Sequence, residues 1–426
     1  MTYIDFFLLL TEHWMLFVLS MAVGMTAFML IAFRITSSWL SPLRYQTVIC
    51  GIGFSVVLFL LFTQSISREN ATYIILSFVL FWTVLLSLYK NKQRKVSIRI
   101  ISDSYYSSSL FWHLYLLNIL LTLVSYSKFG LPILNENSRL AVYVDSGGWG
   151  VIYRLQQFMT VYIYFYLFCL YLDKKKTVGY IIKLMILPIV FGILSGSRSS
   201  FLGVIFCLWG ARTYYCGLKT QLYPFRKLLV ALIAISIFSF SLKADNLSIA
   251  TLSFLQRIVS SGDTYWMALY QNNWDDVIVS NPLKYLTIGF LGPLRLLDTS
   301  STETPIGFQL YQLVYPEMDN MVGPIGYFPV LSYVLFGRFG GLLYSGILGA
   351  ISATAISFSF IRSNSIIISS VYYYAFLTSM SLLSDTSVAI SRLFDFVLNI
   401  AVVFGILILI SFYKLLRSYG KSISVG

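Results

Sequence analysis

The interval from Lys243 to Val330 opens with KADNLSIATLSFLQRIVSSGDTYW (243–266) and is the one long polar stretch of an otherwise apolar chain. It holds most of the side chains that can take part in chemistry. These include Arg257, Asp263, Lys284, Arg295, Asp298, Glu303, Glu317 and Asp319. Polar backbone and charged side chains are excluded from lipid unless the protein satisfies them internally. We therefore expect residues 243–330 to form a large extracytoplasmic loop that caps a membrane-embedded site.

The composition around this loop is that of a membrane protein. Of the 426 residues, 58% are hydrophobic and 11% are charged, whereas about a quarter of the residues in soluble domains are charged. The apolar runs are continuous and do not alternate with period two, which excludes a strand barrel. The expected fold is an all-α polytopic integral membrane protein, built as a single membrane domain over residues 1–426.

Hydropathy predicts roughly eleven transmembrane helices, or twelve with an unrecognised span. The predicted spans are 14–33, 45–62, 71–89, 110–126, 155–172, 178–194, 201–215, 228–242, 340–361, 366–383 and 394–412. The apolar residues 6–10 are expected either to extend the first helix or to lie in the interface. There is no basic segment or small-residue cleavage site before Arg34, so we expect the first helix to be retained.

The distribution of basic residues predicts the orientation. Lys and Arg cluster in alternate loops, at 34–44, 90–99, 174–176 and 212–227, and again in the tail after residue 413. The positive-inside rule makes these segments cytoplasmic. The N-terminus is then expected outside the cytoplasm, which is the periplasm in a bacterial inner membrane, and the C-terminus in the cytoplasm. The net charge of +13 is explained by this asymmetry, and no nucleic-acid partner is expected.

Metal and cofactor sites are not indicated. No CxxC pair or clean ligand spacing is present, and the carboxylate pairs at 275–276 and 317–319 lack further ligands. The cysteines lie in or beside apolar runs and are interpreted as packing residues. They are Cys50, Cys169, Cys207 and Cys216.

A short break, LSGSRSS (194–200), separates two predicted spans. Its small residues can hold Arg198 at the outer membrane boundary, where a planar guanidinium suits a phosphate or pyrophosphate. Alternatively, Arg198 snorkels to the interface and the neighbouring residues only make the turn.

Three further motifs lie in the predicted outer loops. The segments NENSRL (135–140) and DSGGWG (145–150) precede Arg154, which begins a span; an ordinary hairpin is the alternative. In QRIVSSGDTYW (256–266), Arg257 suits phosphate, Asp263 suits hydroxyls, and Tyr265 and Trp266 suit stacking on sugars. The glycine-rich and proline-rich segments 316–326 and 336–341 predict irregular backbone at membrane depth, with a hinge as the alternative.

These motifs together resemble the Wzy-type O-antigen polymerases, a bacterial family of oligosaccharide repeat-unit polymerases. The resemblance spans nearly the whole layout of the chain. It implies a membrane glycosyltransferase of the bacterial inner membrane with a GT-C-type architecture. The substrate it implies is a polyprenyl-pyrophosphate-linked oligosaccharide, polymerised at the periplasmic face and surrounded by membrane lipid, with a chain-length regulator as a further candidate partner.

The implied reaction transfers the growing glycan to a hydroxyl of an incoming lipid-linked repeat unit, with inversion and without metal. Arginines would neutralise the charge that develops on the pyrophosphate. Asp263 is the first candidate for orienting or deprotonating the acceptor, followed by Glu317 and Asp319. The first candidates for binding the pyrophosphate are Arg198 and Arg257, and a second group of candidates is Arg139, Arg154, Arg295 and Arg338. The candidate sugar-binding residues are Tyr265 and Trp266.

Two alternatives stay open. O-antigen ligases have a similar layout, but that family carries a functional histidine in its large loop and residues 243–330 contain none. A transporter or flippase of a lipid-linked oligosaccharide would share a basic, aromatic cavity. The strongly unequal loops argue against a transporter built from two matched halves.

Overall fold

The computed structural model describes residues 1–36, 38–89, 105–132, 150–195, 200–216, 256, 258–297, 304–317, 323–324, 326–357 and 363–423. Within these segments the regular secondary structure is helical, and no strand is formed. Eight of the described helices are long and apolar enough to cross a membrane. The predicted all-α, multi-pass membrane architecture is therefore confirmed, whereas the total number of spans stays a prediction because residues 228–242 lie outside the described segments.

The first third of the chain follows the predicted spans closely. They correspond to α2 (Trp14–Ile35), α3 (Pro42–Phe62) and α4 (Arg68–Leu88). The apolar start forms a separate helix, α1 (Tyr3–Glu12). Thr2 and Asp5 form a capping box at its N-terminus. The chain breaks at His13, whose backbone is not helical, before α2 starts.

The later helices also lie near their predicted positions. They are α5 (Tyr105–Phe129), α7 (Gly150–Leu172), α8 (Val178–Leu194), α9 (Ser200–Cys216), α16 (Ile366–Ser379), η4 (Met380–Leu383) and α17 (Thr386–Ile423).

Helix α15 (Phe328–Ser357) consists of two helical parts that meet at Gly337. The predicted end of the loop at Val330 lies near the start of the first part, and the predicted start of the ninth span at residue 340 lies near the start of the second. Pro329 is compatible with a first helical turn because its missing N–H has no partner there in any case. Gly337 has a φ of 67°, and the chain folds back on itself there. A Cβ atom at Gly341 would lie 2.7 Å from the Ser332 carbonyl oxygen, and the Ser332 hydroxyl lies 3.4 Å from that of Ser345. The irregular backbone predicted for residues 336–341 is therefore found at this glycine.

The chain divides into two compact units. Unit 1 comprises residues Met1–Lys92, Gln221–Phe358 and Phe376–Arg392, and unit 2 comprises the remainder. The two units are defined by how closely their residues pack. This division does not test the prediction of a single membrane domain. Each unit is described by itself.

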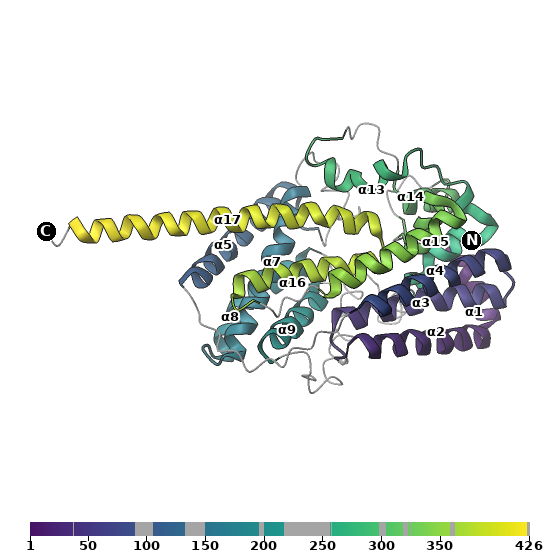
Figure 1. The fold of residues 1–426 in the computed structure, drawn as a ribbon, viewed down its shortest axis with the longest axis horizontal. Helices are drawn as coiled ribbons and strands as arrows, with labels where there is room; N and C mark the ends of the chain where they lie inside the picture. The colour runs from purple at the N-terminus through teal and green to yellow at the C-terminus, as the bar shows by residue number, and fades with distance from the viewer. Residues whose placement is uncertain are drawn as a thin grey trace. The chain divides into compact units, whose positions relative to one another are not determined.

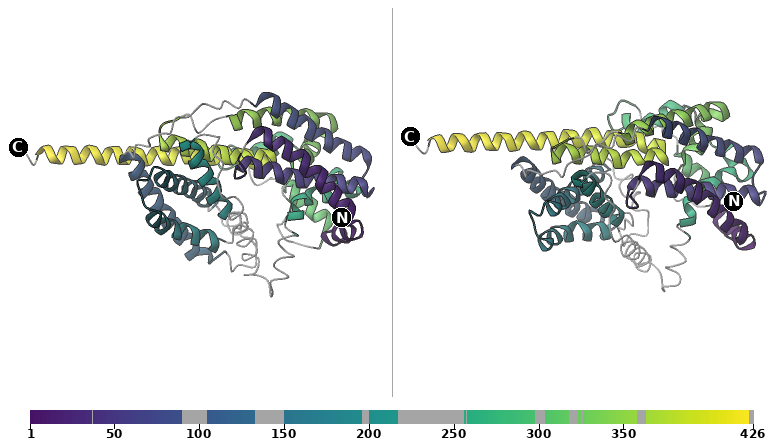
Figure 2. Two further views of the ribbon diagram at one scale, coloured as in Figure 1. Left: turned by 90° about the horizontal axis from the view of Figure 1, so that it is seen from below. Right: turned by 60° about the horizontal axis from the view of Figure 1, so that its bottom comes forward.

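Two close helix pairs form the frame of unit 1: α2 runs antiparallel to α3, and the part of α15 after Gly337 runs parallel to α4 (Figure 1). A Cβ atom at Gly24 would lie 2.2 Å from the Ser55 hydroxyl, and one at Gly349 would lie 2.5 Å from the Phe81 carbonyl oxygen. Figure 2 shows both pairs from two other directions. Small residues at these positions allow the backbones to approach closely, as is typical of helices in membranes.

The ends of these helices alternate as the basic loops predict. The Tyr89 hydroxyl donates to the Ile35 carbonyl at 3.2 Å, which places the C-terminal ends of α2 and α4 together. The residues after α3 and before α4 therefore lie at the opposite end of unit 1. Which end faces the cytoplasm stays a prediction.

The described part of the predicted loop folds into short helices. They are η1 (Ser260–Gly262), α12 (Asp263–Leu269), η2 (Tyr270–Asp275), α13 (Pro282–Leu291) and α14 (Ile306–Val314). Every residue of α12 is buried. Gly53 of α3 lies against the Tyr265 ring and Gly262 lies against Val56. Residues 260–269 of the interval are thus part of the core of unit 1.

Unit 2 is organised around the aromatic helix α7. The ring of Phe165 stacks on Tyr373 with centroids 5.3 Å apart, and Tyr162 stacks on Tyr166 at 6.1 Å. Arg154, one turn into α7, forms an ion pair with the fully buried Asp395 of α17. This pair fixes one end of α7 against α17.

The packing of α15 on α4 yields a prediction with a matched control on the same helix. Gly349→Ala should lower the free energy of unfolding by about 1–3 kcal/mol because its methyl group would overlap the Phe81 backbone. At Gly346 no atom lies within 4 Å of a built Cβ, so Gly346→Ala should leave stability unchanged or raise it. Thermal unfolding of the purified variants in detergent measures both, and equal effects would contradict the packing.

Candidate functional site

The structure describes part of the predicted site. Unit 1 holds Asp263, Tyr265, Trp266, Arg295, Glu317 and Arg338, and unit 2 holds Arg154. Outside the described residues lie Arg139, Arg198, Arg257 and Asp319. The roles assigned to all of these residues stay predictions, whereas the surroundings of the described ones are given by the structure.

Asp263 begins α12 and is 4% exposed. Its Oδ2 accepts a hydrogen bond from the Tyr3 hydroxyl at 2.8 Å, and its Oδ1 accepts one from the Thr264 backbone at 2.9 Å. The Tyr3 backbone N–H in turn donates to the Tyr315 hydroxyl at 2.6 Å. In this conformation Asp263 anchors the first helix to the segment that was predicted to be a loop.

Tyr265 and Trp266 are fully buried. The Trp266 ring stacks on Phe6 with centroids 4.0 Å apart, and the Tyr265 ring stacks on Tyr327 at 5.2 Å. Burial raises the pKa of Tyr265 well above its usual range. The structure therefore uses both rings as core, and stacking on a sugar would require them to become exposed.

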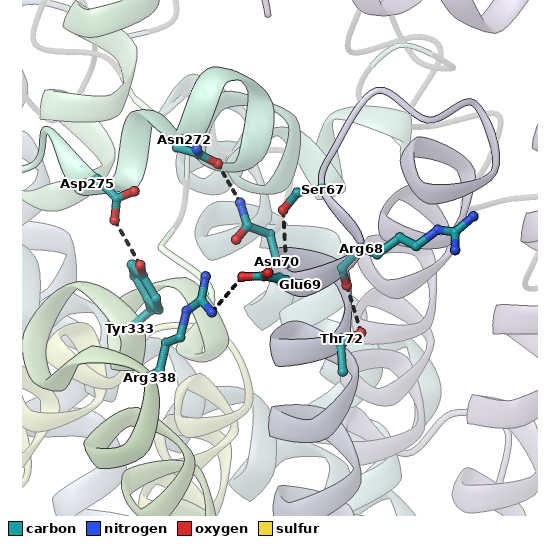
Figure 3. A network of polar contacts seen from close by, with 9 residues as sticks. All are labelled: Ser67, Arg68, Glu69, Asn70, Thr72, Asn272, Asp275, Tyr333 and Arg338. Atoms are coloured by element: carbon teal, nitrogen blue, oxygen red, sulfur yellow. Dashed lines mark hydrogen bonds and ion pairs between the residues drawn. The ribbon is translucent and has the colours of Figure 1, made fainter.

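Arg338 belongs to a polar network at the end of unit 1 where α4 begins (Figure 3). Its Nη1 donates to Glu69 Oε2 at 2.9 Å, while the Tyr333 hydroxyl donates to Asp275 Oδ1 at 2.9 Å. Asn70 Nδ2 donates to Asn272 Oδ1 at 2.6 Å. The network joins α4, η2 and both parts of α15, because Tyr333 precedes the break at Gly337 and Arg338 follows it.

Local backbone and ring packing hold this network in place. Gln271 and Asn272 both adopt left-handed backbone conformations, with φ of 56° and 60°, which turn the chain sharply inside η2. Trp274 then stacks on Tyr333 with ring centroids 3.9 Å apart. The kink at Gly337 immediately precedes Arg338 and sets the direction from which its side chain leaves the helix.

The ion pair between Arg338 and Glu69 lies at the surface, with side-chain exposures of 50% and 75%. Exposed pairs of this kind add little net stability because both groups are already well solvated. Glu69 can therefore be replaced by another anion with little loss, and a guanidinium binds phosphate oxygens in a bidentate manner. The guanidinium of Arg68 points away from this pair (Figure 3).

The other described candidates lie elsewhere. Arg295 is exposed in the turn after α13, where its φ is 57°, and Glu317 is exposed beyond α14. Arg154 is paired with Asp395 within unit 2 and is 26% exposed. A role in phosphate binding would require Arg154 to share or leave that buried carboxylate.

Asp385 is a further, partly buried acid that the sequence motifs did not single out. Its Oδ1 accepts from the Ser387 backbone at 2.9 Å, from the Ser387 hydroxyl at 2.7 Å and from the Val388 backbone at 3.2 Å. It thereby caps the start of α17. Burial raises the pKa of Asp385, and the capping hydrogen bonds oppose that rise.

Two sequence signals could have found the residues that were missed. Arg68, Glu69 and Asn70 form a charged and polar triplet between two apolar spans, which marks a helix start exposed to water. Asp395 is an acid inside a predicted span. An ionisable group at such a position is normally paired with an opposite charge and has a functional or structural role.

Within the described residues, no three or more His, Cys, Asp or Glu side chains come together in a group that could hold a metal ion. The metal independence of the reaction stays a prediction. No protein-family model, curated protein or solved structure matches the chain.

The anchoring of Tyr3 by Asp263 can be tested directly. Tyr3→Phe should lower the free energy of unfolding by about 1–3 kcal/mol because it removes one hydrogen-bond donor from a buried carboxylate. The matched control is Tyr413→Phe, which removes a hydroxyl from a residue that is 61% exposed and should change stability little. Thermal unfolding of both variants is the measurement, and similar shifts would argue against the anchor.

Proposed function

We propose that this protein is a polysaccharide repeat-unit polymerase of the bacterial inner membrane. It would transfer a growing glycan from polyprenyl pyrophosphate to a hydroxyl of an incoming lipid-linked unit at the periplasmic face. The support is the resemblance carried by the loop motifs, together with the multi-pass helical architecture. The observation that favours anion chemistry at the end of unit 1 is the half-exposed guanidinium of Arg338, held by an exchangeable surface carboxylate.

In this proposal the acceptor oxygen attacks the anomeric carbon from the side opposite the leaving group. The bond from that carbon to the pyrophosphate oxygen breaks, and the lipid pyrophosphate keeps the electron pair. Arg338 exchanges Glu69 for the pyrophosphate and stabilises the added charge, which is the effect expected of a preorganised cation. The configuration at the anomeric carbon is inverted.

The proton of the acceptor hydroxyl needs a destination. Asp263 is the candidate named from sequence, and it can take this proton only after the Tyr3 hydroxyl leaves its Oδ2 atom. Asp263→Asn would then lower the rate, whereas Tyr3→Phe would leave the carboxylate intact and more available. The two substitutions together separate a base from an anchor.

The second candidate function is transport of a lipid-linked oligosaccharide across the membrane. Transport is favoured by the exposed cation of Arg338 and by the multi-pass helical fold. Unlike the polymerase reaction, it needs no activated acceptor hydroxyl. An O-antigen ligase is the related enzymatic alternative. A ligase would join the glycan to a different acceptor and would not give a ladder of repeats.

An assay with the purified chain and one lipid-pyrophosphate-linked repeat unit decides among these functions. No nucleotide sugar or metal is added, and a chelator is present. We expect a ladder of products differing by one repeat unit, read by gel or mass spectrometry. Folded protein that makes no ladder but binds the substrate or moves it between leaflets would overturn the polymerase proposal in favour of transport.

The contribution of Arg338 is measured in the same assay. Arg338→Ala should lower the rate by roughly 10²-fold or more, as is usual for loss of one group that stabilises developing charge. Arg338→Lys should recover part of the rate, because a point charge lacks the bidentate fork. Arg68→Ala, which removes a neighbouring guanidinium that points away, is the control and should keep the normal rate.

Glu69→Ala distinguishes substrate binding from a structural ion pair. If Arg338 binds pyrophosphate, removal of its resting partner should keep or raise activity. If the pair merely holds α15 to α4, Glu69→Ala and Arg338→Ala should reduce activity to the same extent, and Arg338 would then leave the proposed site.

A further inference from the structure

Arg44 is a buried cation near the start of α3, at the end of unit 1 opposite to the Arg338 network. The residue is 2% exposed. Its guanidinium carbon lies 4.5 Å from the ring centroid of Phe33 and 4.5 Å from that of Trp39. Its Nη2 donates to the Thr36 carbonyl at 2.7 Å. Two aromatic rings and one carbonyl thus surround a full positive charge.

The remaining donors of this guanidinium are not satisfied. Both Nε and Nη1 are buried and have no hydrogen-bond partner among the described residues. A buried charge is costly unless it is paired, and a buried donor without an acceptor adds a further desolvation penalty. The cation–π contacts with Phe33 and Trp39 offset only part of the cost of burying the Arg44 charge. Within the described part of the chain, the arrangement therefore lacks an acceptor that carries negative charge.

The chain around Arg44 does not supply that charge. Residues 34–44, which comprise the end of α2, the connection and the start of α3, contain Arg34 and Arg44 and no Asp or Glu. Ser41 occupies the N-cap of α3, yet its side chain makes no capping hydrogen bond. The first-turn N–H groups of a helix have no intrahelical partner and favour an anion. The start of α3 and the two unpartnered nitrogens of Arg44 therefore both favour an anion.

We propose that Arg44 is the centre of a binding site for the phosphate of an anionic lipid headgroup. The phosphate would accept from Nε and Nη1 in a bidentate manner. Phe33 and Trp39 are 54% and 45% exposed, and they offer apolar and aromatic surface to the acyl chains beside the headgroup. Trp39 shifts from the guanidinium as the phosphate enters. The site is independent of the proposed reaction, which is assigned to other residues.

The experiment uses the full chain purified in nonionic detergent. Short-chain phosphatidylglycerol is titrated and its binding is followed by native mass spectrometry and by thermal unfolding. We expect Arg44→Gln to weaken phosphatidylglycerol binding by about tenfold or more, a change equal to about 1.4 kcal/mol. The matched control Arg34→Gln removes an exposed cation at the end of α2 and should change the affinity by less than about twofold.

Two further probes identify the source of the phosphate. Diacylglycerol with the same acyl chains lacks phosphate and should not compete. Sodium phosphate carries the headgroup chemistry without the chains and should bind more weakly than phosphatidylglycerol. Equal binding of diacylglycerol would overturn the proposal, and sodium phosphate binding as tightly as the lipid would overturn the lipid as its source.

The stability of the lipid-free protein gives an independent readout. Removing an unpaired buried cation should leave the unfolding midpoint of Arg44→Gln equal to or above that of the unmodified protein, whereas added phosphatidylglycerol should raise only the latter. A lower midpoint for Arg44→Gln without lipid, together with retained stabilisation by lipid, would show that Arg44 serves the fold alone.

Discussion

The close approach of α15 to α4 is the contact on which the polar end of unit 1 depends. Helix α4 carries Glu69 and Asn70, and α15 carries Tyr333 and Arg338, so the Arg338 network exists only while the two backbones stay in register. Gly341 and Gly349 permit that register, because a Cβ at either would meet Tyr73 or the Phe81 carbonyl. Packing between small residues is sensitive to one methyl group, which makes the position of the network a direct consequence of two glycines.

Charge inside the protein is handled in three different ways. Asp395 is neutralised by an arginine across two helices, and Asp385 is held by the first N–H groups of α17. Asp263 is satisfied by hydrogen bonds from Tyr3 and from its own helix. Arg44 differs from all of these, because the described residues around it supply rings and a single carbonyl but no opposite charge. The contrast supports the proposal that Arg44 binds an anionic ligand.

Hydropathy predicted most of the fold because continuous apolar runs in lipid have one solution, the helix. It did not predict the short helical part of α15 before Gly337, residues 328–336, which packs back against the part that follows. The candidate site was harder to predict. Asp263 and Trp266 carry the residue types of a sugar site, and sequence cannot tell that Tyr3 and Phe6, more than 250 positions away, would cover them. Arg338 could be named from sequence because it is an arginine beside a predicted loop. Its partner Glu69 could not, because the two residues are brought together only by the packing of α15 on α4.

The two best-defined candidates within unit 1 differ in how readily they can change partners. Arg338 is paired with an exposed carboxylate that water or phosphate can replace, so a charged leaving group can reach it without disturbing the core. Asp263 is buried at the junction of α1, α12 and α14, and releasing its Oδ2 would loosen the N-terminal helix. A reaction that depends on binding a pyrophosphate can use the first arrangement as it stands. A general base in the second arrangement would need an opening of unit 1, so the cation is the better supported half of the proposed chemistry.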